Sequence, residues 1–418
     1  MVIRDPSCED DFDPDSLNCD EALARILAQV APISGYERLS LRSALGRVLK
    51  QALYSPFDVP AHTNSAMDGY ALNANDLPAS GNTRLRVIGS AFAGRPFTGQ
   101  AVSGEAVRIM TGAAMPAGTD IVVMQEHATR DGDHVFIDGQ HKRGQNVRAA
   151  GEDLKQDQQI FAAGRRLVAP DLGIIASLGI GEVTVRRRVR VAYFSTGDEL
   201  RSIGESLGPG EIYDSNRYTL YAMLKRTDVE IIDMGVVRDT REAVEAALRE
   251  ASRVADVVIT SGGVSVGEAD YIKEVLSAIG QVRFWKVAMK PGRPLAFGTL
   301  GQARFFGLPG NPVSVMVTFY QFVQPALFKM AGTVASTPLV LKARTTAVLN
   351  KRPGRTEFQR GFLSRDALGE LRVTATGDQG SGILNSMASA DCFIILGMDT
   401  GRVESDTLVD VQPFQGLF

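Results

Sequence analysis

The stretch ADVVITSGGVSVGEADYIKEVLSAIG, residues 255–280, decides how the second half of this chain folds. Its apolar run VVI predicts a buried strand, and the run that begins at Tyr271 has the spacing of a helix. The loop between them carries three glycines within residues 262–267, together with hydroxyl and carboxylate side chains. Glycines adopt positive φ and leave backbone N–H groups accessible, which suits an anion such as a phosphate. Asp270 lies either beside that anion or at the cap of the helix.

The alternation of strands and helices extends over residues 186–335. It predicts a mainly parallel sheet with helices on both faces, which is a three-layer α/β domain. Ligands of such sheets bind at the carboxyl ends of the strands. Polar loops follow the predicted strands at STGDEL (195–200), SGGVSVGEAD (261–270), KPGRP (290–294) and LPGNP (308–312). We therefore expect these loops to meet at one edge of the sheet and to form a site.

Each of these loops also has a purely structural interpretation. STGDEL is either a ligand loop or a helix N-terminus, capped by Ser195 or Thr196 with acids in its first turn. The helix SNRYTLYAMLKR that follows it is capped by Asp214 or Ser215. In LPGNP, Pro312 fits the first position of the next helix.

Positive charge gathers in WKVAMKPGRP, residues 285–294. Lys286, Ala288 and Lys290 alternate, so in one continuous strand they would point to the same side. An oxyanion substrate needs such charge, whereas the alternative is a solvated strand edge with ordinary surface lysines.

The rest of the chain has a different texture. Residues 1–19 form an acidic tail, and Asp20 is expected to cap a helix whose apolar face includes Ile26. A second short helix is expected after Ser40, and a third within residues 165–180. The predicted segments are a linking domain at 20–53 and 146–185, an inserted β-rich domain at 54–145, and a small all-β domain at 336–418.

Composition limits the classes of function. The chain has 418 residues and a net charge of −3, which argues against nucleic acid as a general partner. No apolar run reaches the roughly 18 residues of a membrane span, and the acidic N-terminus is not a secretory signal. The three cysteines have no CxxC spacing, so we expect a reducing, cytoplasmic setting. The four histidines are explained by hairpin turns more simply than by a zinc site.

Outside the α/β segment, three polar loops are candidates for the same chemistry. NSAMDGYA presents Ser65 and Asp68, MTGA presents Thr111, and GED presents Asp153. Taken alone, each of them is explained more simply by an ordinary turn than by a site.

Taken in order, NSAMDGYA, IMTGA, STGDEL, IYDSN, TSGGVSVGEADY, KVAMKPGRP and LPGNPVS closely resemble the motifs of the MoeA family, the molybdopterin molybdenumtransferases. The family is related to the E domain of gephyrin, and the resemblance covers residues 20–418. It implies a four-domain subunit with a C-terminal β-barrel, and a homodimer whose active site is shared between subunits. It also implies that molybdate and adenylylated molybdopterin react in the presence of Mg²⁺ to give molybdenum cofactor and AMP.

The resemblance also assigns the site, motif by motif. The catalytic residues are Asp68, Asp153, Glu199, Asp239, Asp270, Lys286 and Lys290. Glu199 and Asp270 are expected to hold Mg²⁺. With the loop residues described above, the expected substrate-binding set is Ser65, Thr111, Ser195, Thr196, Gly197, Asp214, Ser215, Asn216, Ser261, Gly262, Gly263, Ser265, Gly267, Arg293, Pro309, Asn311 and Pro312. Arg293 lies at a position that varies in the family.

Two other functions remain open. A molybdopterin adenylyltransferase fits the α/β segment alone, but it normally lacks the preceding β-rich segment and the STGDEL and KPGRP loops. A scaffold that binds a partner peptide keeps the same fold, but it does not require acidic and basic residues at every loop. The candidate protein partners are a second copy of the chain, a molybdopterin adenylyltransferase and molybdoenzyme maturation proteins.

Overall fold

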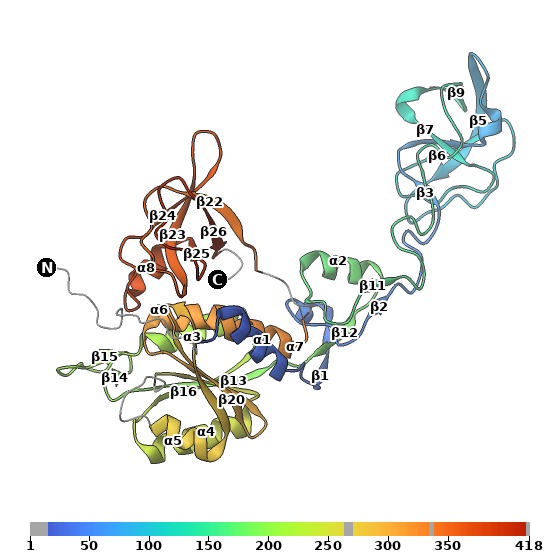
Figure 1. Cartoon of the computed structure of the whole chain (residues 1–418). Coiled ribbons are helices and arrows are strands. Elements are labelled where there is room, and N and C mark those ends of the chain that lie inside the picture. The colour runs from blue at the N-terminus through green and yellow to red at the C-terminus, as the bar shows by residue number, and fades with distance from the viewer. Residues whose placement is uncertain (1–15, 263–270, 334–337, 415–418) are drawn as a thin grey trace. The chain divides into compact units, whose positions relative to one another are not determined.

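The computed structural model describes residues 16–262, 271–333 and 338–414. The chain divides into two compact units, whose elements are labelled in Figure 1. The smaller unit, called the β-rich unit below, contains residues 38–45 and 49–184. The larger unit contains residues 1–37, 46–48 and 185–418. The finer division into five predicted segments stays a prediction.

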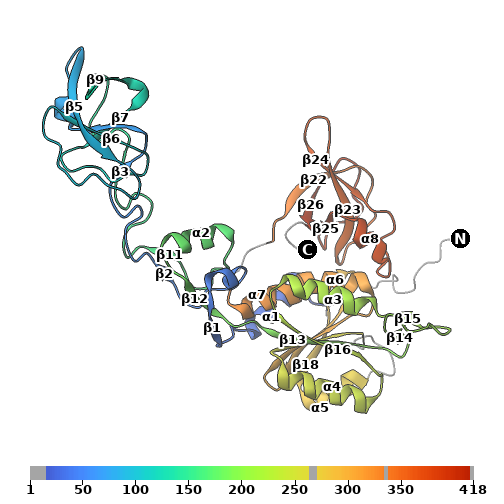
Figure 2. The same ribbon diagram turned by 180° about the vertical axis from the view of Figure 1, so that it is seen from behind.

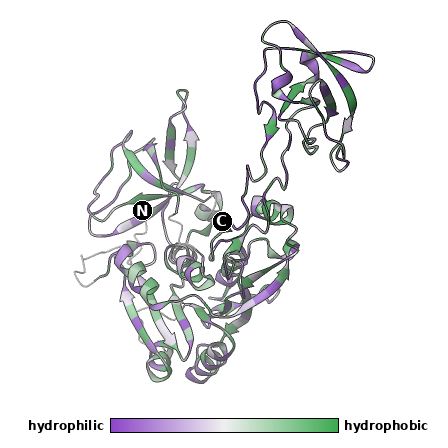
Figure 3. Cartoon of the chain, turned by 90° about the vertical axis from the view of Figure 1, so that its right-hand side faces the viewer, coloured by the Kyte–Doolittle hydropathy of each residue, from purple (hydrophilic) through white to green (hydrophobic). Residues whose placement is uncertain are grey.

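A six-stranded sheet forms the centre of the larger unit, in the order β16-β13-β17-β21-β20-β18. The strands are β16 (Glu230–Val237), β13 (Arg190–Thr196), β17 (Val257–Ser261), β21 (Ala303–Leu308), β20 (Pro294–Leu300) and β18 (Gln281–Lys286). The first four run parallel, whereas β20 is antiparallel to both of its neighbours. The chain is coloured by hydropathy in Figure 3, and the central strands β13, β17 and β21 consist almost entirely of buried residues, as expected of a sheet that is covered on both faces. The predicted mainly parallel sheet is confirmed.

Helices cover both faces of this sheet (Figures 1 and 2). One face carries α4 (Arg241–Val254) and α5 (Tyr271–Ile279). The other carries α1 (Cys19–Gln29), α3 (Ser215–Arg226), α6 (Pro312–Thr318), a π-helical turn (Phe319–Val323) and α7 (Gln324–Ala331). Successive side chains of β17 point to opposite faces of the sheet: Val257 and Ile259 belong to one buried cluster, and Val258 belongs to the other. Among the described residues, no helix is both long and apolar enough to cross a membrane.

The first helix, α1, packs on the core of the larger unit. Ala22 and Ile26 are fully buried in the same cluster as Leu220 of α3, which fits the apolar face predicted from the spacing. The predicted cap was wrong, because Asn18 rather than Asp20 precedes the first turn. The Oδ1 atom of Asn18 accepts a hydrogen bond from the Glu21 amide at 2.7 Å.

The β-rich unit contains a second six-stranded sheet, in the order β7-β4-β6-β5-β9-β8. Its strands are β7 (Ile121–Met124), β4 (Gly69–Leu72), β6 (Glu105–Ile109), β5 (Asn82–Ala91), β9 (His134–Asp138) and β8 (Ala128–Asp131). Three two-stranded pairs each join a strand that comes before this sheet in the sequence to a strand that comes after it. They are β1 (Tyr36–Ser40) with β12 (Glu182–Arg186), β2 (Leu53–Tyr54) with β11 (Gln159–Phe161), and β3 (Asn64–Ser65) with β10 (Val147–Arg148). The helix within 165–180 is present as α2 (Ala169–Ser177).

The helix expected after Ser40 is shorter than its spacing suggested. It is a single 3-10 turn (Leu41–Ala44), and two further short turns of this type lie at Ala74–Asp76 and Gln125–His127. Leu45, the residue that follows this turn, is 55% exposed. At Leu45 the backbone no longer has helical angles, so the apolar spacing after Ser40 does not correspond to the face of a helix.

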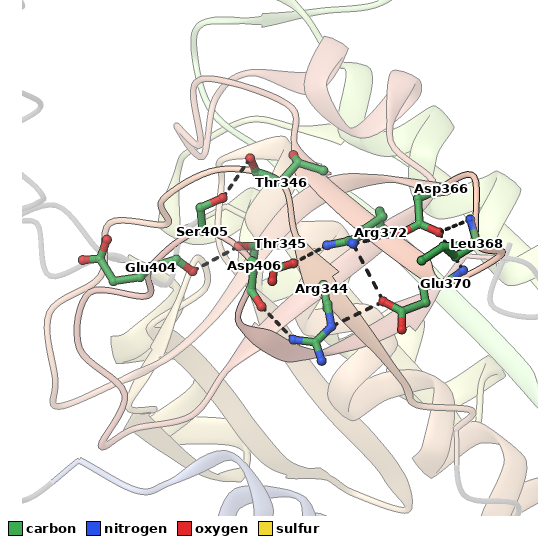
Figure 4. Close-up of polar contacts among 10 residues, drawn as sticks. All are labelled: Arg344, Thr345, Thr346, Asp366, Leu368, Glu370, Arg372, Glu404, Ser405 and Asp406. Carbon is green, nitrogen blue, oxygen red and sulfur yellow. Dashed lines mark hydrogen bonds and ion pairs between the residues drawn. The ribbon is translucent and has the colours of Figure 1, made fainter.

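The C-terminal part of the larger unit is a closed five-stranded barrel. The strands β23 (Thr356–Arg365), β24 (Leu371–Ala375), β22 (Leu341–Thr345), β26 (Leu408–Pro413) and β25 (Cys392–Leu396) pair in that order, and β25 closes on β23. A short helix, α8 (Leu384–Ser389), interrupts what we predicted to be an all-β segment. Figure 4 shows ion pairs at one side of the barrel, where Arg372 and Arg344 both contact Glu370.

A partly buried ion pair fixes the start of β17 against the start of β13. The guanidinium of Arg187 donates to both carboxylate oxygens of Asp256, at 2.7 and 2.8 Å, and the Arg190 amide donates to the same group at 2.8 Å. Burial by itself would raise the pKa of Asp256, but the hydrogen bonds from Arg187 and Arg190 outweigh it and lower the pKa. The carboxylate is therefore charged in the folded protein at neutral pH.

We predict that Asp256→Asn lowers the free energy of unfolding by about 2 kcal/mol at neutral pH, because it removes a charge-assisted pair. The pKa of Asp256 is lowered in the folded state. The stabilisation is therefore complete above the ordinary Asp pKa of about 3.9 and is lost as pH falls through the lowered value. Urea titrations of both proteins at several pH values measure this difference. Glu230→Gln, which breaks the exposed 3.1 Å pair with Arg190, is the control and should change stability by less than about 0.5 kcal/mol. Equal effects of the two substitutions would contradict the prediction.

Candidate functional site

The carboxyl ends of the four parallel strands lie at the same level. Ser195 at the end of β13 pairs in register with Ser261 of β17, and Ser261 pairs with Leu308 of β21. Thr196 is likewise level with Val237, the last residue of β16. The loops that follow these strands therefore leave one edge of the sheet together, as expected.

Gly262 is the first residue of the glycine-rich loop and shows why a side chain is excluded there. Its φ is +89°, and a Cβ atom would lie 2.7 Å from the carbonyl oxygen of Thr196. Its amide donates to the Leu308 carbonyl at 3.2 Å, which ties the loop to β21. The remaining predicted residues of this loop, Gly263, Ser265, Gly267 and Asp270, lie outside the described residues.

The N-terminus of α3 reaches this edge. Of the two candidate caps, Asp214 is the one used: its Oδ1 accepts from the Arg217 amide at 3.1 Å, whereas Ser215 is exposed. Two residues further on, the side-chain amide of Asn216 donates to Ser261 Oγ at 3.1 Å and to the Gly310 carbonyl at 2.6 Å. Asn216 thus connects α3, the end of β17 and the LPGNP loop.

Carboxylates gather at the ends of β13 and β16. Burial raises the pKa of Asp239, and the negative charges of Asp198 and Glu199 raise it further. No helix begins at STGDEL, so that interpretation was wrong. Instead the chain passes from Thr196 through Gly197 into β14 (Leu200–Arg201), which pairs with β15 (Ile212–Tyr213). The exposed acids are consequently not held by a helix N-terminus.

The barrel contributes a residue that the sequence analysis missed. Ser381 accepts a hydrogen bond at its Oγ from the Asn311 side chain at 3.0 Å, and its carbonyl accepts from the Val313 amide at 3.1 Å. Asn311 precedes α6, and Pro312 occupies the first turn of that helix as predicted. The preceding Pro309 is buried. The loop DQGSG, residues 378–382, has the same glycine, hydroxyl and acid composition as the loops singled out above, and that signal could have revealed it.

Arg360 fixes the loop that carries Ser381. This arginine is 1% exposed, and its guanidinium donates to the backbone carbonyls of Gln379 and Gly380, each at 3.0 Å, and to Ser386 Oγ at 3.0 Å. Burial lowers the pKa of Arg360 to about 10, so the side chain remains charged at neutral pH. A buried arginine bonded to carbonyls holds the loop rigidly.

The two lysines do not share one strand, which corrects the expected alternation. β18 ends at Lys286, which is exposed, and Ala288 is buried. Lys290 belongs to β19 (Met289–Lys290), which pairs with β23 of the barrel beside Glu357. Two tight backbone contacts, Val287 N to Arg293 O and Met289 N to Val287 O, break the pleat on which the alternation depended.

The KPGRP loop nevertheless remains beside α6. A Cβ atom on Gly292 would lie 2.7 Å from Thr318, so the glycine allows the loop to pack directly on that helix. Pro291 and Gly292 are buried, while Arg293 is partly exposed.

In the β-rich unit the structure joins two of the predicted residues. The backbone amide and the hydroxyl of Thr111 both donate to Asp68 Oδ1, each at 2.7 Å. These two hydrogen bonds lower the pKa of Asp68, so it is a carboxylate at neutral pH. Ser65 is fully buried, and its hydroxyl donates to the Met67 carbonyl at 2.5 Å. That hydrogen bond shapes the loop before Asp68, and the expected contact of Ser65 with substrate stays a prediction.

Asp153 lies on a separate loop of the β-rich unit. Its amide donates to the Val59 carbonyl at 2.9 Å, and its side chain is exposed. The loop is shaped by Gly151, which has a φ of +72° and whose amide donates to the Pro60 carbonyl at 3.1 Å. Asp153 is thus free to contact a ligand without a local conformational change.

The oxygen-rich edge of the larger unit has the chemistry that a hard divalent cation prefers. Burial raises the pKa of Asp239 most, and the negative charges of Asp198 and Glu199 add to that rise. Within the described residues, no group of three His, Cys, Asp or Glu side chains is arranged to hold a metal by itself. Of the two predicted Mg²⁺ ligands, Glu199 lies at this edge, and Asp270 falls outside the described residues.

A cavity of about 940 Å³ lies elsewhere in the larger unit, between α3, α6 and the barrel. Its lining is mainly apolar and includes Met316, Leu384, Met387 and Phe414. No predicted site residue lines it. The polar loops at the strand ends are therefore a separate feature.

Comparison with protein families covers most of the chain. Residues 17–179 match the MoeA N-terminal region (domains I and II), residues 192–329 match a probable molybdopterin binding domain, and residues 342–414 match the MoeA C-terminal region (domain IV). These matches follow the order of the linking and β-rich segments, the α/β sheet and the barrel.

Known proteins show the same similarity over nearly the whole of this chain. The chain is 44% identical over 403 residues to a molybdopterin molybdenumtransferase of Haemophilus influenzae, covering 96% of this chain and 99% of the relative. It is 32% identical to gephyrin of Dictyostelium discoideum, covering 93% of this chain and 61% of that protein. Among solved structures, a molybdopterin biosynthesis moeA protein of Pyrococcus horikoshii superposes with a TM-score of 0.84 at 28% identity, covering 95% of this chain and 100% of the other.

We predict that Asp198→Asn lowers the pKa of Asp239 without returning it to the ordinary value, because burial continues to raise it. Carboxyl carbon chemical shifts followed by NMR over a pH titration measure this change. Glu242→Gln, in the first turn of α4, is the matched control and should leave the titration of Asp239 in place. An unchanged Asp239 titration in the Asp198 variant would show that the carboxylates do not interact.

Proposed function

This chain belongs to the MoeA family of molybdopterin molybdenumtransferases, and we propose that it inserts molybdenum from molybdate into adenylylated molybdopterin in the presence of Mg²⁺, with release of AMP. The observation that carries the proposal is the meeting of the loops after β13, β17 and β21 at one edge, level with one another. The described residues at this edge include the Gly262 amide, the Ser195 and Ser261 hydroxyls and the carboxylate of Glu199, groups that suit a phosphorylated pterin. The chemistry proposed for each part of the edge follows from its charge.

The glycine-rich loop is proposed to bind the phosphates. Positive φ at Gly262 and the absence of a side chain let an anion approach the backbone closely. Ser261 and Asn216 are already hydrogen-bonded to each other, which fixes the wall of the site on the side of α3. The ligand therefore meets a preorganised surface, with little ordering needed on binding.

The acidic residues are proposed to serve the cation and the leaving phosphate. Glu199 and Asp270 would hold Mg²⁺, which when bound supplies charge neutralisation to the phosphoanhydride. Asp239, with its pKa raised by burial, Asp198 and Glu199, is suited to accept or hold a proton at the same edge. Two carboxylates in different environments can thus take different roles.

The lysines are proposed to attract molybdate, a dianion. Lys286 ends β18, and Lys290 lies in the loop that packs on α6, so both follow the edge strand on the β18 side of the sheet. Lys286 remains at the end of β18, and Lys290 lies four residues further along the chain, in the short strand that pairs with β23. Pro309 and Pro312 hold the adjacent LPGNP loop rigid, and Arg293 adds positive charge in the same segment.

A homodimer that shares its active sites is proposed because the predicted residues are divided between the two units. Asp68, Thr111 and Asp153 belong to the β-rich unit, whereas Glu199 and Asp239 belong to the larger unit. The hydrogen bonds from Thr111 keep Asp68 ionised, so it can act toward a substrate held by another subunit. We also propose a cytoplasmic location, with a molybdopterin adenylyltransferase and molybdoenzyme maturation proteins as candidate partners.

An adenylyltransferase is the alternative within the same chemistry. The match to a probable molybdopterin binding domain covers residues 192–329 and fits either activity. The matches to the MoeA N-terminal and C-terminal regions on both sides of it favour molybdenum insertion.

We predict that Glu199→Gln and Asp270→Asn each slow AMP release by roughly 30- to 1,000-fold, because loss of one metal-ligand charge costs about 2–4 kcal/mol of transition-state stabilisation. The measurement is AMP formed from adenylylated molybdopterin with saturating Mg²⁺ and molybdate, together with reconstitution of an apo molybdoenzyme. Glu205→Gln, on the segment between β14 and β15, is the matched control and should retain normal turnover. Near-normal rates in both site variants would refute the assignment of these carboxylates.

We further predict that Asp68→Ala and Glu199→Ala subunits, each inactive alone, recover activity when they are mixed and allowed to exchange. A mixed dimer carries one site with both substitutions and one with neither, so up to about half of its sites are intact. Each subunit bears a different affinity tag, and the doubly tagged species is purified and assayed for AMP release. If such heterodimers form and remain inactive, the site is not shared between subunits.

A further inference from the structure

Three polar atoms at the strand-end edge are buried without a hydrogen-bond partner among the described residues: Asp214 Oδ2, Asn216 Oδ1 and Ser195 Oγ. Asp214 is 3% exposed and Ser195 is fully buried. A buried polar group left unpaired costs about 1–3 kcal/mol, so native proteins keep few of them. Three in one place indicate a ligand that supplies the missing bonds.

The hydrogen bonds around Asn216 show that these atoms belong to one surface. Its amide nitrogen faces the Gly310 carbonyl, which can only accept, so the orientation of the amide is fixed and Oδ1 is the unused atom. The same nitrogen donates to Ser261, which is the register neighbour of Ser195 and so lies on the same face of the sheet. Asp214 precedes Asn216 by two residues, and its other oxygen is already used to cap α3.

The unused atoms determine what can bind. A carboxylate oxygen and an amide oxygen accept hydrogen bonds and donate none, so this surface repels a phosphate and requires N–H or O–H donors. The pyrimidine edge of a pterin presents its 2-amino group and its N3–H side by side, next to the C4 carbonyl. Two acceptors and one hydroxyl complement these two donors and one acceptor. The Watson–Crick edge of adenine offers an amino group beside a ring acceptor and fits less well.

We propose that Asp214 and Asn216 recognise the 2-amino and N3–H groups of the pterin and that Ser195 donates to its C4 carbonyl. This assignment rests on the proposed function, and it specifies that these residues bind the pyrimidine edge of the pterin. The phosphates are then directed away from Asp214, toward the glycine-rich loop. The three residues determine specificity for the pterin, because a site built to hydrogen-bond a polar edge discriminates strongly against ligands that lack it.

The test measures binding of two probes, 6-hydroxymethylpterin and AMP, to the full-length protein. Asp214→Asn keeps an oxygen for capping α3 but places an amino group against the pterin donors, so the Kd for the pterin should rise at least tenfold. Ser195→Ala should weaken pterin binding by a smaller factor and leave the melting temperature unchanged, since this hydroxyl has no partner among the described residues of the free protein. Glu21→Gln, an exposed carboxylate in the first turn of α1, is the control for loss of charge.

Quenching of pterin fluorescence reports the first probe, and calorimetry reports AMP. The proposal is supported if both variants lose pterin affinity while AMP affinity is retained. It is overturned if the wild-type protein does not bind the pterin, if folded variants bind it normally, or if only AMP affinity falls, which would place adenine or ribose on this surface. Wild-type protein that binds the pterin through these residues but releases no AMP from adenylylated molybdopterin would refute the proposed function and leave this inference standing.

Discussion

The site depends on the register of the parallel strands in the central sheet. Ser195, Ser261 and Leu308 are neighbours across three strands, so the chain leaves β13, β17 and β21 at one level. The polar segments that follow these strands therefore begin at the same edge of the sheet. A shift of one residue in any of these pairings would turn Ser195 or Ser261 to the opposite face, among the apolar residues under α4 and α5.

The register is maintained from the opposite end of the sheet. Asp256 precedes β17 and is bonded to Arg187 and to the backbone of β13, and its carbonyl also accepts from the Arg304 amide at the start of β21. One acidic residue therefore aligns three strands before they enter the core. The buried apolar residues between the two ends, such as Val258 and Ile259, make any other alignment costly because they fill both faces.

Preorganisation also comes from outside the sheet. The barrel supplies Ser381 to the LPGNP loop, and Arg360 holds the Ser381 loop through hydrogen bonds to backbone carbonyls. In the β-rich unit, Thr111 fixes Asp68 in the same way, with a backbone and a side-chain donor on one carboxylate oxygen. In both cases hydrogen bonds from a neighbouring residue hold a candidate site residue or its loop in place, and such preorganisation reduces the entropy lost on binding.

The sequence by itself determined the element types of the larger unit, because the apolar periodicity of strands and helices and the glycines at strand ends are local properties. It likewise predicted the loop glycine at Gly262 and the start of a helix at Asn311 and Pro312, because these residue types favour those backbone conformations. Tertiary structure alone decided which residues meet. Lys286 and Lys290 alternate in the sequence, yet a backbone turn between them sends Lys290 to the barrel. Ser65 looks like a ligand residue, but packing buries its hydroxyl in its own loop. Asp214 and Asn216 begin α3, whereas Ser195 ends β13, and only the folded sheet brings these two segments to the same edge, because hydrogen-bond satisfaction depends on contacts between residues far apart in the chain.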